Sequence, residues 1–209
     1  MAKKTSITFL ILLIVFTQGY SQEFETLRLK IEDIINSKNA TVGVAINGGE
    51  VRDTLSINGQ RHFPMQSVFK FPIALTVLSE IDKGNLSFDQ KIEIKKRELL
   101  PGIWSPIREK YPEGGTLTIA EILEYTVALS DNVGCDVLLK LLGKPQAVEN
   151  YFSSLGFQDI SVKINEETMQ GNWDLQFLNW TTPKEAYRIL ATFYENIDRL
   201  LSIESHDFV

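Results

Sequence analysis

The sequence predicts a mixed fold of the α+β or α/β class, with a helical subdomain and an antiparallel-sheet subdomain. Residues 23–37 carry apolar side chains at helical spacing, which predicts an amphipathic helix that packs on a sheet. Residues 42–57 alternate in the manner of two strands around a tight turn at Asn47-Gly48-Gly49. From residue 66 onward helical patterns dominate, so residues 42–57 give only the two-stranded start of an antiparallel sheet.

Residues 1–21 have the form of a secretory signal peptide. They begin with Lys3-Lys4, continue with the apolar run Ile7 to Phe16 and end with Gly19-Tyr20-Ser21, which places small residues before a cleavage point. A membrane anchor is disfavoured because a spanning helix needs about 20 apolar residues. We therefore expect export to the periplasm, no membrane association after cleavage, and a mature domain over 22–209.

Composition favours a soluble globular protein that acts on a small molecule. The chain is 44% hydrophobic and 23% charged, with a net charge of -6 and no basic run after the N-terminus, which argues against nucleic-acid binding. The single cysteine, Cys135, cannot form an internal disulfide and is expected to be a small buried hydrophobe. Besides this thiol, His62 and His206 are the only imidazole or thiol side chains, which disfavours a zinc site. We therefore expect no metal and no cofactor.

The central helix is expected to run from close to Ser67 to a stop at Lys83-Gly84. The stretch Phe69 to Ile81 is apolar on nearly every face, as is typical of a buried helix. Pro72 fits only within the first turn, where its missing N–H is not needed, so the helix must begin near Ser67. Ser67 would then lie at the positive end of the helix dipole.

Residues 85–115 are predicted to hold one short strand, Lys91 to Ile94, and then a loop rich in proline and glycine. Three helices follow in the sequence, each with a cap or a glycine stop. Their predicted ranges are 118–129, 132–142 and 145–154.

The stretch 158–181 shows no clean periodicity. Structureless loops of such length are uncommon in compact domains and are usually functional, so we interpret it as an active-site loop. Thr182-Pro183-Lys184-Glu185 then starts another helix with an N-cap, a proline at the first position and a glutamate at the third. Its predicted buried stripe consists of Ala186, Ile189, Leu190 and Phe193.

Ser67 and Lys70 form the first candidate for chemistry. Residues three apart on a helix lie about 5–6 Å apart at Cβ, so the hydroxyl and the amine can approach one another. A serine is a weak nucleophile that needs a base beside it, and a lysine can serve when it is neutral. Taken alone, the pair is common enough to be an ordinary surface pair.

Ser130-Asp131-Asn132 is the second candidate, because a turn between two helices can present a hydroxyl and an amide toward one cleft. Its alternative is an ordinary helix cap, since all three residue types favour such junctions. The two motifs together are far more specific than either alone.

These motifs resemble two of the three signatures of class A serine β-lactamases, relatives of the penicillin-binding D,D-peptidases. Gln66, Asn165-Glu166 and Asn179-Trp180-Thr181 resemble the extended-spectrum branch found in Bacteroidetes-type bacteria. The resemblance covers about residues 24–209 and implies the β-lactamase/transpeptidase-like fold. Within it, 22–60 would supply the first helix and sheet hairpin, and 61–209 the mainly helical subdomain.

The resemblance implies a role for each matching residue. Ser67 would attack the lactam carbonyl with help from Lys70, and Ser130 would pass a proton to the leaving nitrogen. Asn132 would hydrogen-bond the side-chain amide of the β-lactam substrate. Glu166 would activate the water that hydrolyses the acyl-enzyme, although Glu166 and Glu167 are both open to the alternative of a solvated loop charge.

Two further residues have a site role and an alternative. Gln170 stands where the family more often has asparagine, and its amide could help to position the water. Trp104 resembles the aromatic residue that lines the substrate entrance, but as a lone aromatic it could equally be part of the core.

The third family signature, Lys-Thr-Gly, does not occur in these 209 residues. We therefore expect the chain to be truncated by about a quarter to a third of a typical domain. Because a lone hairpin is unstable in water, the chain as written is expected to fold poorly or to expose a strand edge, whereas a complete chain would be a monomer. The alternatives to a β-lactamase are an inactive fragment and a penicillin-binding D,D-peptidase.

Overall fold

The computed structural model describes residues 23–48 and 54–209. The contacts of these residues form two compact units, one that ends at Arg61 and one that spans His62–Val209. The predicted signal segment, residues 1–21, lies outside the described residues. None of the helices in the described ranges is long and apolar enough to cross a membrane.

The first unit contains a helix and a two-stranded antiparallel sheet. The helix covers residues 23–36, and the strands are β1 (Val44–Asn47) and β2 (Thr54–Ile57), as the sequence predicts. Arg28 joins the helix to the sheet, since its Nη1 donates to the Ser56 carbonyl at 3.2 Å. The predicted turn at residues 47–49 and the start of the second predicted strand extend into 49–53, outside the described residues.

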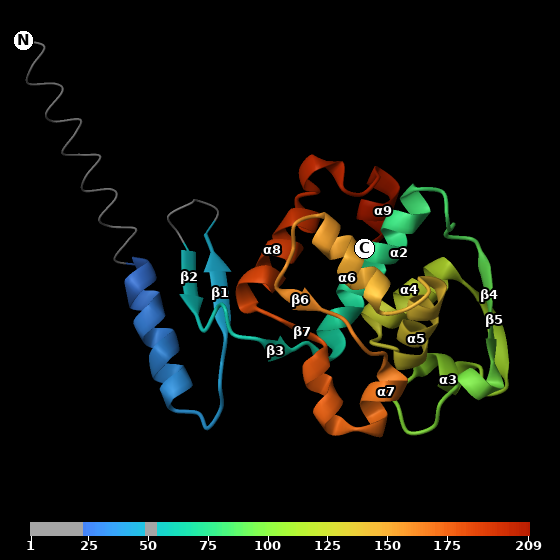
Figure 1. Cartoon of the computed structure of the whole chain (residues 1–209), viewed down its shortest axis with the longest axis horizontal. Coiled ribbons are helices and arrows are strands. Elements are labelled where there is room, and N and C mark those ends of the chain that lie inside the picture. Colours follow the sequence, from blue (N-terminus) through green and yellow to red (C-terminus); the bar gives the residue numbers. More distant parts are fainter. Residues whose placement is uncertain (1–22, 49–53) are drawn as a thin grey trace, which may run out of the picture. The chain divides into compact units, whose positions relative to one another are not determined.

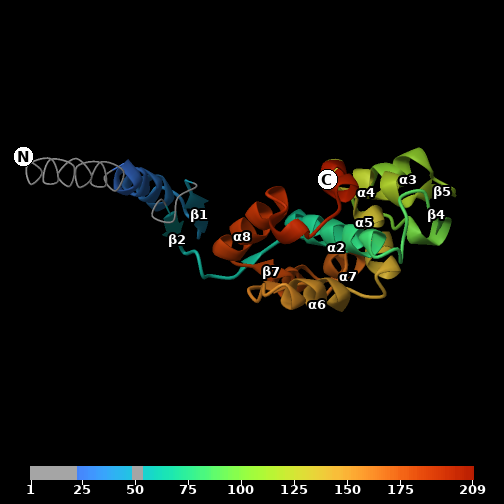
Figure 2. The ribbon, with the colours of Figure 1, turned by 90° about the horizontal axis from the view of Figure 1, so that it is seen from above.

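The second unit is built around α2 (Lys70–Asp82), which a 3₁₀ turn at Gln66–Phe69 precedes. Pro72 is the third residue of α2, as predicted, so its missing N–H costs no helical hydrogen bond. Four helices contact α2, namely α4 (Ile119–Ala128), α5 (Asn132–Leu141), α6 (Gln146–Ser154) and α9 (Ile203–Phe208). Figure 2 shows α2 between α9 and α6. Ile73, Leu75 and Leu78 are fully buried, so α2 is the central helix that its apolar sequence predicts.

The other helices of this unit surround α2 (Figure 1). Three predicted helices, 118–129, 132–142 and 145–154, are confirmed within one or two residues of their predicted ends, and the first of them begins with a capping box of Thr118 and Glu121. The helices are α3 (Pro106–Lys110), α4 (Ile119–Ala128), α5 (Asn132–Leu141), α6 (Gln146–Ser154), α7 (Glu166–Gly171), α8 (Pro183–Tyr194) and α9 (Ile203–Phe208).

Two elements appear where the sequence predicted only a loop. Ser105 caps α3, with Pro106 at its first position, so this short helix has an ordinary start that the surrounding prolines obscured. Strand β5 (Gly114–Thr118) pairs with the predicted strand, β4 (Lys91–Lys95). Gly114 allows this pairing because a Cβ there would lie 2.5 Å from the Ile94 carbonyl oxygen.

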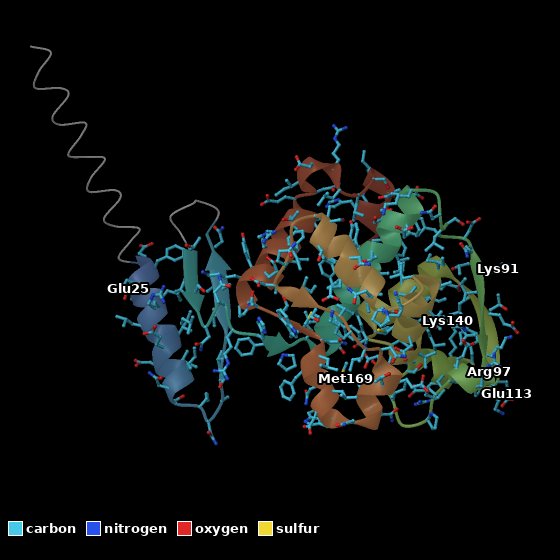
Figure 3. The ribbon with its side chains drawn as sticks, in the orientation of Figure 1. Glu25, Lys91, Arg97, Glu113, Lys140 and Met169 are labelled. Carbon is cyan, nitrogen blue, oxygen red and sulfur yellow. The ribbon has the colours of Figure 1, made fainter. Side chains whose placement is uncertain are left out.

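The β4–β5 pair lies at the edge of this unit, and Figure 3 shows Lys91, Arg97 and Glu113 around it. All three residues are exposed.

One residue of the buried stripe predicted for α8 is wrong: Leu190 is 56% exposed, whereas Ile189 and Phe193 are buried. A one-residue difference around a helix changes the facing direction by about 100°, which explains why Ile189 is covered and Leu190 is not.

The stretch 158–181 contains short elements rather than a structureless loop. It holds β6 (Ile160–Ser161), α7, a 3₁₀ segment (Trp173–Leu178) and β7 (Trp180–Thr181). Strand β7 pairs with β6 and also with β3 (Phe63–Pro64). The end of the stretch, β7, is therefore joined directly to the strand that lies shortly before Ser67, and its beginning, β6, is joined to that strand only through β7.

Candidate active site

Ser67 lies in the exposed 3₁₀ turn at the start of α2, one turn from the buried Lys70. Lys70 Nζ lies 3.2 Å from Ser67 Oγ, so the pair meets as the spacing predicts. Lys70 is 2% exposed, whereas Ser67 is exposed to solvent. The hydroxyl is therefore accessible to a ligand while its amine partner is enclosed by protein.

Both interpretations of the Ser130-Asp131-Asn132 turn hold, since Asp131 caps a helix and Ser130 contacts Ser67. Asp131 is the N-cap of α5, where its buried carboxylate accepts from Gly134 N and from the Ser105 hydroxyl. Ser130 is held in a left-handed conformation with φ 56°. Its Oγ donates to Ser67 Oγ at 2.9 Å, so the cap residue fixes a turn that delivers its neighbour to Ser67.

Lys70 is the centre of the cluster. Its Nζ lies 2.9 Å from the Ser130 carbonyl oxygen, 3.1 Å from Ser130 Oγ and 3.1 Å from Glu166 Oε1, and it also donates to Asn132 Oδ1. With Ser67 Oγ this makes five oxygens around a group that has three protons at most. The amine can thus change partners without moving, which suits a group that passes protons.

Glu166, rather than Glu167, is the loop carboxylate that reaches this cluster. Its side chain is 12% exposed and lies against Lys70, while Glu167 is exposed to solvent. Glu166 is the first residue of α7, and Asn165 caps that helix by accepting from Thr168 N at 3.1 Å. The cap sets the start of α7 and hence the direction of the Glu166 side chain.

Asp136 of α5 holds the start of α7 in place. Its carboxylate accepts from Glu166 N at 2.7 Å, from Glu167 N at 3.0 Å and from Asn165 Nδ2 at 3.0 Å. Burial raises the pKa of Asp136 from 3.8 to about 6. The two amide hydrogen bonds lower this pKa, and the carboxylates of Glu166 and Glu167 raise it.

No role for Asp136 is predicted from the sequence. It follows Asn132 by four residues, so the two share one face of α5, and this spacing was the available signal.

Asn179 closes the neck of the loop. Its fully buried side chain accepts from Lys163 N at 2.8 Å and from Ile164 N at 3.1 Å, and it donates to the Ile164 carbonyl at 2.9 Å. Asn179 was expected to matter only through the family resemblance of Asn179-Trp180-Thr181. A single asparagine gives no signal of such a long-range clamp.

Trp104 lies next to the Ser130 turn, and Gln170 lies against the stretch that precedes Trp104. Trp104 is 58% exposed, which excludes a core position, and its Nε1 donates at 2.9 Å to the carbonyl of Leu129, the residue before Ser130. The Gln170 side chain extends from α7 to the segment before Trp104, where its Nε2 lies 3.4 Å from the Pro101 carbonyl oxygen. Its suggested part in positioning water stays a prediction.

Cys135 and His62 take part in none of the hydrogen bonds described for this cluster. Cys135 is buried, and that burial raises the pKa of its thiol well above the usual value, as do Glu166 and Asp136. His62 stacks on Trp180 with ring centroids 3.5 Å apart. Within residues 23–48 and 54–209, no three His, Cys, Asp or Glu side chains gather in a way that could hold a metal ion.

Comparison with known proteins gives consistent relatives. The chain is 53% identical to β-lactamase VEB-1 of Pseudomonas aeruginosa, over 97% of this chain and 68% of VEB-1. It is 38% identical to the extended-spectrum β-lactamase PER-1 of the same species, over 83% of this chain and 56% of PER-1. A crystal structure of a class A β-lactamase from Bacteroides cellulosilyticus superposes with a TM-score of 0.80 at 36% identity, covering 90% of this chain and 66% of that one.

These matches confirm the predicted fold and the predicted resemblance, including its extended-spectrum branch. The chain spans between about half and two thirds of the length of these relatives. Residues 26–209 match the model of the family that is described as "Beta-lactamase enzyme family". The chain therefore belongs to the β-lactamase enzyme family, and within it to the class A serine hydrolases.

Proposed function

We propose that this chain carries the acyl-transfer site of a β-lactamase, which hydrolyses β-lactam antibiotics through an ester on Ser67. The observation that carries the proposal is the meeting of Ser67, Ser130 and Glu166 around Lys70 Nζ. Two-step acyl transfer requires a nucleophile with a base, a group that relays a proton and a second base for the water, which is here a carboxylate.

In the first step, Ser67 Oγ attacks the lactam carbonyl carbon and its proton moves to neutral Lys70. The C–N bond of the ring then breaks, and Ser130 donates a proton to the leaving nitrogen while Lys70 restores the Ser130 proton. The positive end of α2 favours the negative charge that develops on the carbonyl oxygen. Asn132 and Trp104 lie beside these groups, where they can contact the rest of the substrate.

In the second step, Glu166 takes a proton from a water molecule that attacks the ester carbonyl and releases Ser67. Its contact with Lys70 keeps the carboxylate close to the nucleophile. A D,D-peptidase that acts on cell-wall peptides is the second candidate, but the contact between Glu166 and Lys70 favours the hydrolase. We also propose that the protein acts as a periplasmic monomer and that it is an extended-spectrum enzyme, as the name of the relative PER-1 says of PER-1.

Mass spectrometry after mixing with penicillin tests the proposal. The wild-type chain is expected to show a short-lived adduct on Ser67. Glu166→Gln keeps the size of the side chain but removes the base, so the adduct lifetime should lengthen by a factor on the order of 10²–10⁴.

Glu167→Gln is the matched control, because it changes the adjacent exposed glutamate and should leave the lifetime as in the wild type. A lasting wild-type adduct would favour the D,D-peptidase. The absence of any adduct would mean that this chain has no activity of its own.

A further inference from the structure

Gln66, the residue directly before Ser67, makes a contact that the reaction scheme does not use. Its backbone lies in the left-handed region with φ 46°, which is uncommon for a residue with a side chain. From this position its Nε2 donates to Oε1 of Gln176 in the 3₁₀ segment Trp173–Leu178. Gln176 is 5% exposed, so this bond joins the nucleophile turn to a buried point of the loop.

Backbone hydrogen bonds lead up to this contact. Strands β3 and β7 pair Pro64 with Trp180, and Met65 N donates to the Asn179 carbonyl at 2.9 Å. The contact of Gln66 with Gln176 adds one more link on the side of Ser67. The same Asn179 binds Ile164, two residues before Glu166, so a continuous set of hydrogen bonds connects the nucleophile turn to the start of α7.

We propose that Gln66 is a positioning residue for deacylation, and that its bond to Gln176 fixes the Glu166 carboxylate relative to Ser67. The inference rests on the proposed function and names a residue that acts in its second step. Lys70 and Ser130 lie on α2 and before α5, outside the loop, so the groups of the first step stay in place when the bond is lost. Losing the bond therefore slows deacylation selectively.

Gln66→Leu and Gln176→Leu remove one amide each and keep side chains of similar size, and leucine at position 66 meets the same backbone restriction as glutamine. In either variant the lifetime of the penicillin adduct on Ser67 should lengthen about tenfold, because a small misplacement of a catalytic group is costly. The rate of adduct formation should change by less than about twofold. Since the two side chains act as a pair, the double variant should resemble the single variants.

Hydrogen exchange of the free protein gives a second readout that needs no activity. The amides of Lys163, Ile164, Glu166 and Glu167 donate to Asn179 or Asp136, so they report on the position of the loop. These amides should exchange about tenfold faster in both single variants. Gln60→Leu, at an exposed glutamine of the first unit, is the control and should leave the exchange unchanged.

Unchanged exchange in Gln66→Leu would overturn the proposal. Equal slowing of adduct formation and adduct breakdown would also overturn it, because a general structural defect has that signature. If the wild-type chain forms no adduct, the proposed function fails for this chain, while faster exchange in the two variants still supports the link from Gln66 to the loop.

Discussion

The helical core and the loop 158–181 are held together by different forces, although both contribute to one site. In the core, apolar side chains of α2, α4 and α5 are fully buried against one another, as with Leu75, Ile122 and Leu138. In the loop, polar side chains make the long-range links, with Asn179 at the neck and Asp136 at the start of α7. The core thus carries Ser67 and Lys70, and the loop carries Glu166.

This difference teaches that the two chemical steps depend on different parts of the structure. Apolar packing tolerates little change in volume and fixes the groups of acyl transfer. A few directional hydrogen bonds fix the carboxylate of hydrolysis, and each of them is lost by a single substitution. Perturbing the core should affect both steps together, whereas perturbing the loop should affect hydrolysis alone.

Leu138→Ala should give the largest effect on stability. Leu138 is fully buried in α5, so the substitution leaves a cavity and should lower the free energy of unfolding by about 3–4 kcal/mol. Urea denaturation measures this loss, and adduct formation and breakdown should decline together. Leu190→Ala is the control, because the Leu190 side chain of α8 is exposed. A comparable loss of unfolding free energy in this variant would contradict the assignment of the core.

Asn179→Ala should lower the free energy of unfolding by about 2–3 kcal/mol, because the N–H groups of Lys163 and Ile164 and the Ile164 carbonyl lose the buried side chain that pairs with them. The loop should open, so trypsin should cleave after Lys163 faster than in the wild type. The adduct on Ser67 should also persist longer while its formation is unchanged. Asn85→Ala, at an exposed asparagine, serves as the control, and unchanged cleavage in Asn179→Ala would show that Asn179 does not close the loop.

Asp136 should make stability depend on pH. Its pKa rises from 3.8 to about 6 on folding, so the folded protein binds more protons than the unfolded chain between these values. Its contribution to the free energy of unfolding should therefore fall by about 2 kcal/mol as the pH rises through this window, and should be constant above it. Urea denaturation of the wild type and of Asp136→Asn at about pH 4 and about pH 7 measures the change.

The difference in unfolding free energy between wild type and Asp136→Asn should shift in favour of the variant as the pH rises. Asp174→Asn, at an exposed loop carboxylate, controls for the general effect of removing a charge. A pH-independent difference for Asp136→Asn would mean that the folded environment does not hold a proton on Asp136.

Lys96→Ala should have the smallest effect. Lys96 Nζ lies 2.9 Å from both carboxylate oxygens of Glu113, but both side chains are largely exposed at the edge of the β4–β5 pair. Exposed ion pairs contribute about 0–1 kcal/mol, so the urea midpoint should hardly change. A loss as large as that of Asn179→Ala would show that polar contacts matter equally everywhere in this unit.

The same division separates what the sequence predicted from what it did not. Helical periodicity and caps predicted α2, α4 and α5, because packing and local hydrogen bonds leave a regular trace in the chain. Ser67, Lys70 and Ser130 lie on those elements, so local spacing and resemblance were enough to expect their meeting. Leu190 shows the limit of periodicity, since the pattern did not distinguish it from the buried Ile189.

The contacts of the loop leave no such trace. Gln66 and Gln176 are more than one hundred positions apart, and Asp136 contacts residues thirty positions away. No periodic pattern encodes a hydrogen bond between distant polar side chains, and only the folded structure shows their pairing. Glu166 was expected from resemblance, but the groups that hold it were not.

Gly102 lies where the loop meets the stretch that bears Trp104. Its φ is 87°, and a Cβ added there would lie 2.6 Å from Nε2 of Gln170, which follows Glu166 by four residues on α7. Any side chain at position 102 must therefore displace the Gln170 amide. A substitution at position 102 during evolution could therefore change the position of the Gln170 amide, while Ser67, Lys70, Ser130 and Glu166 stay the same.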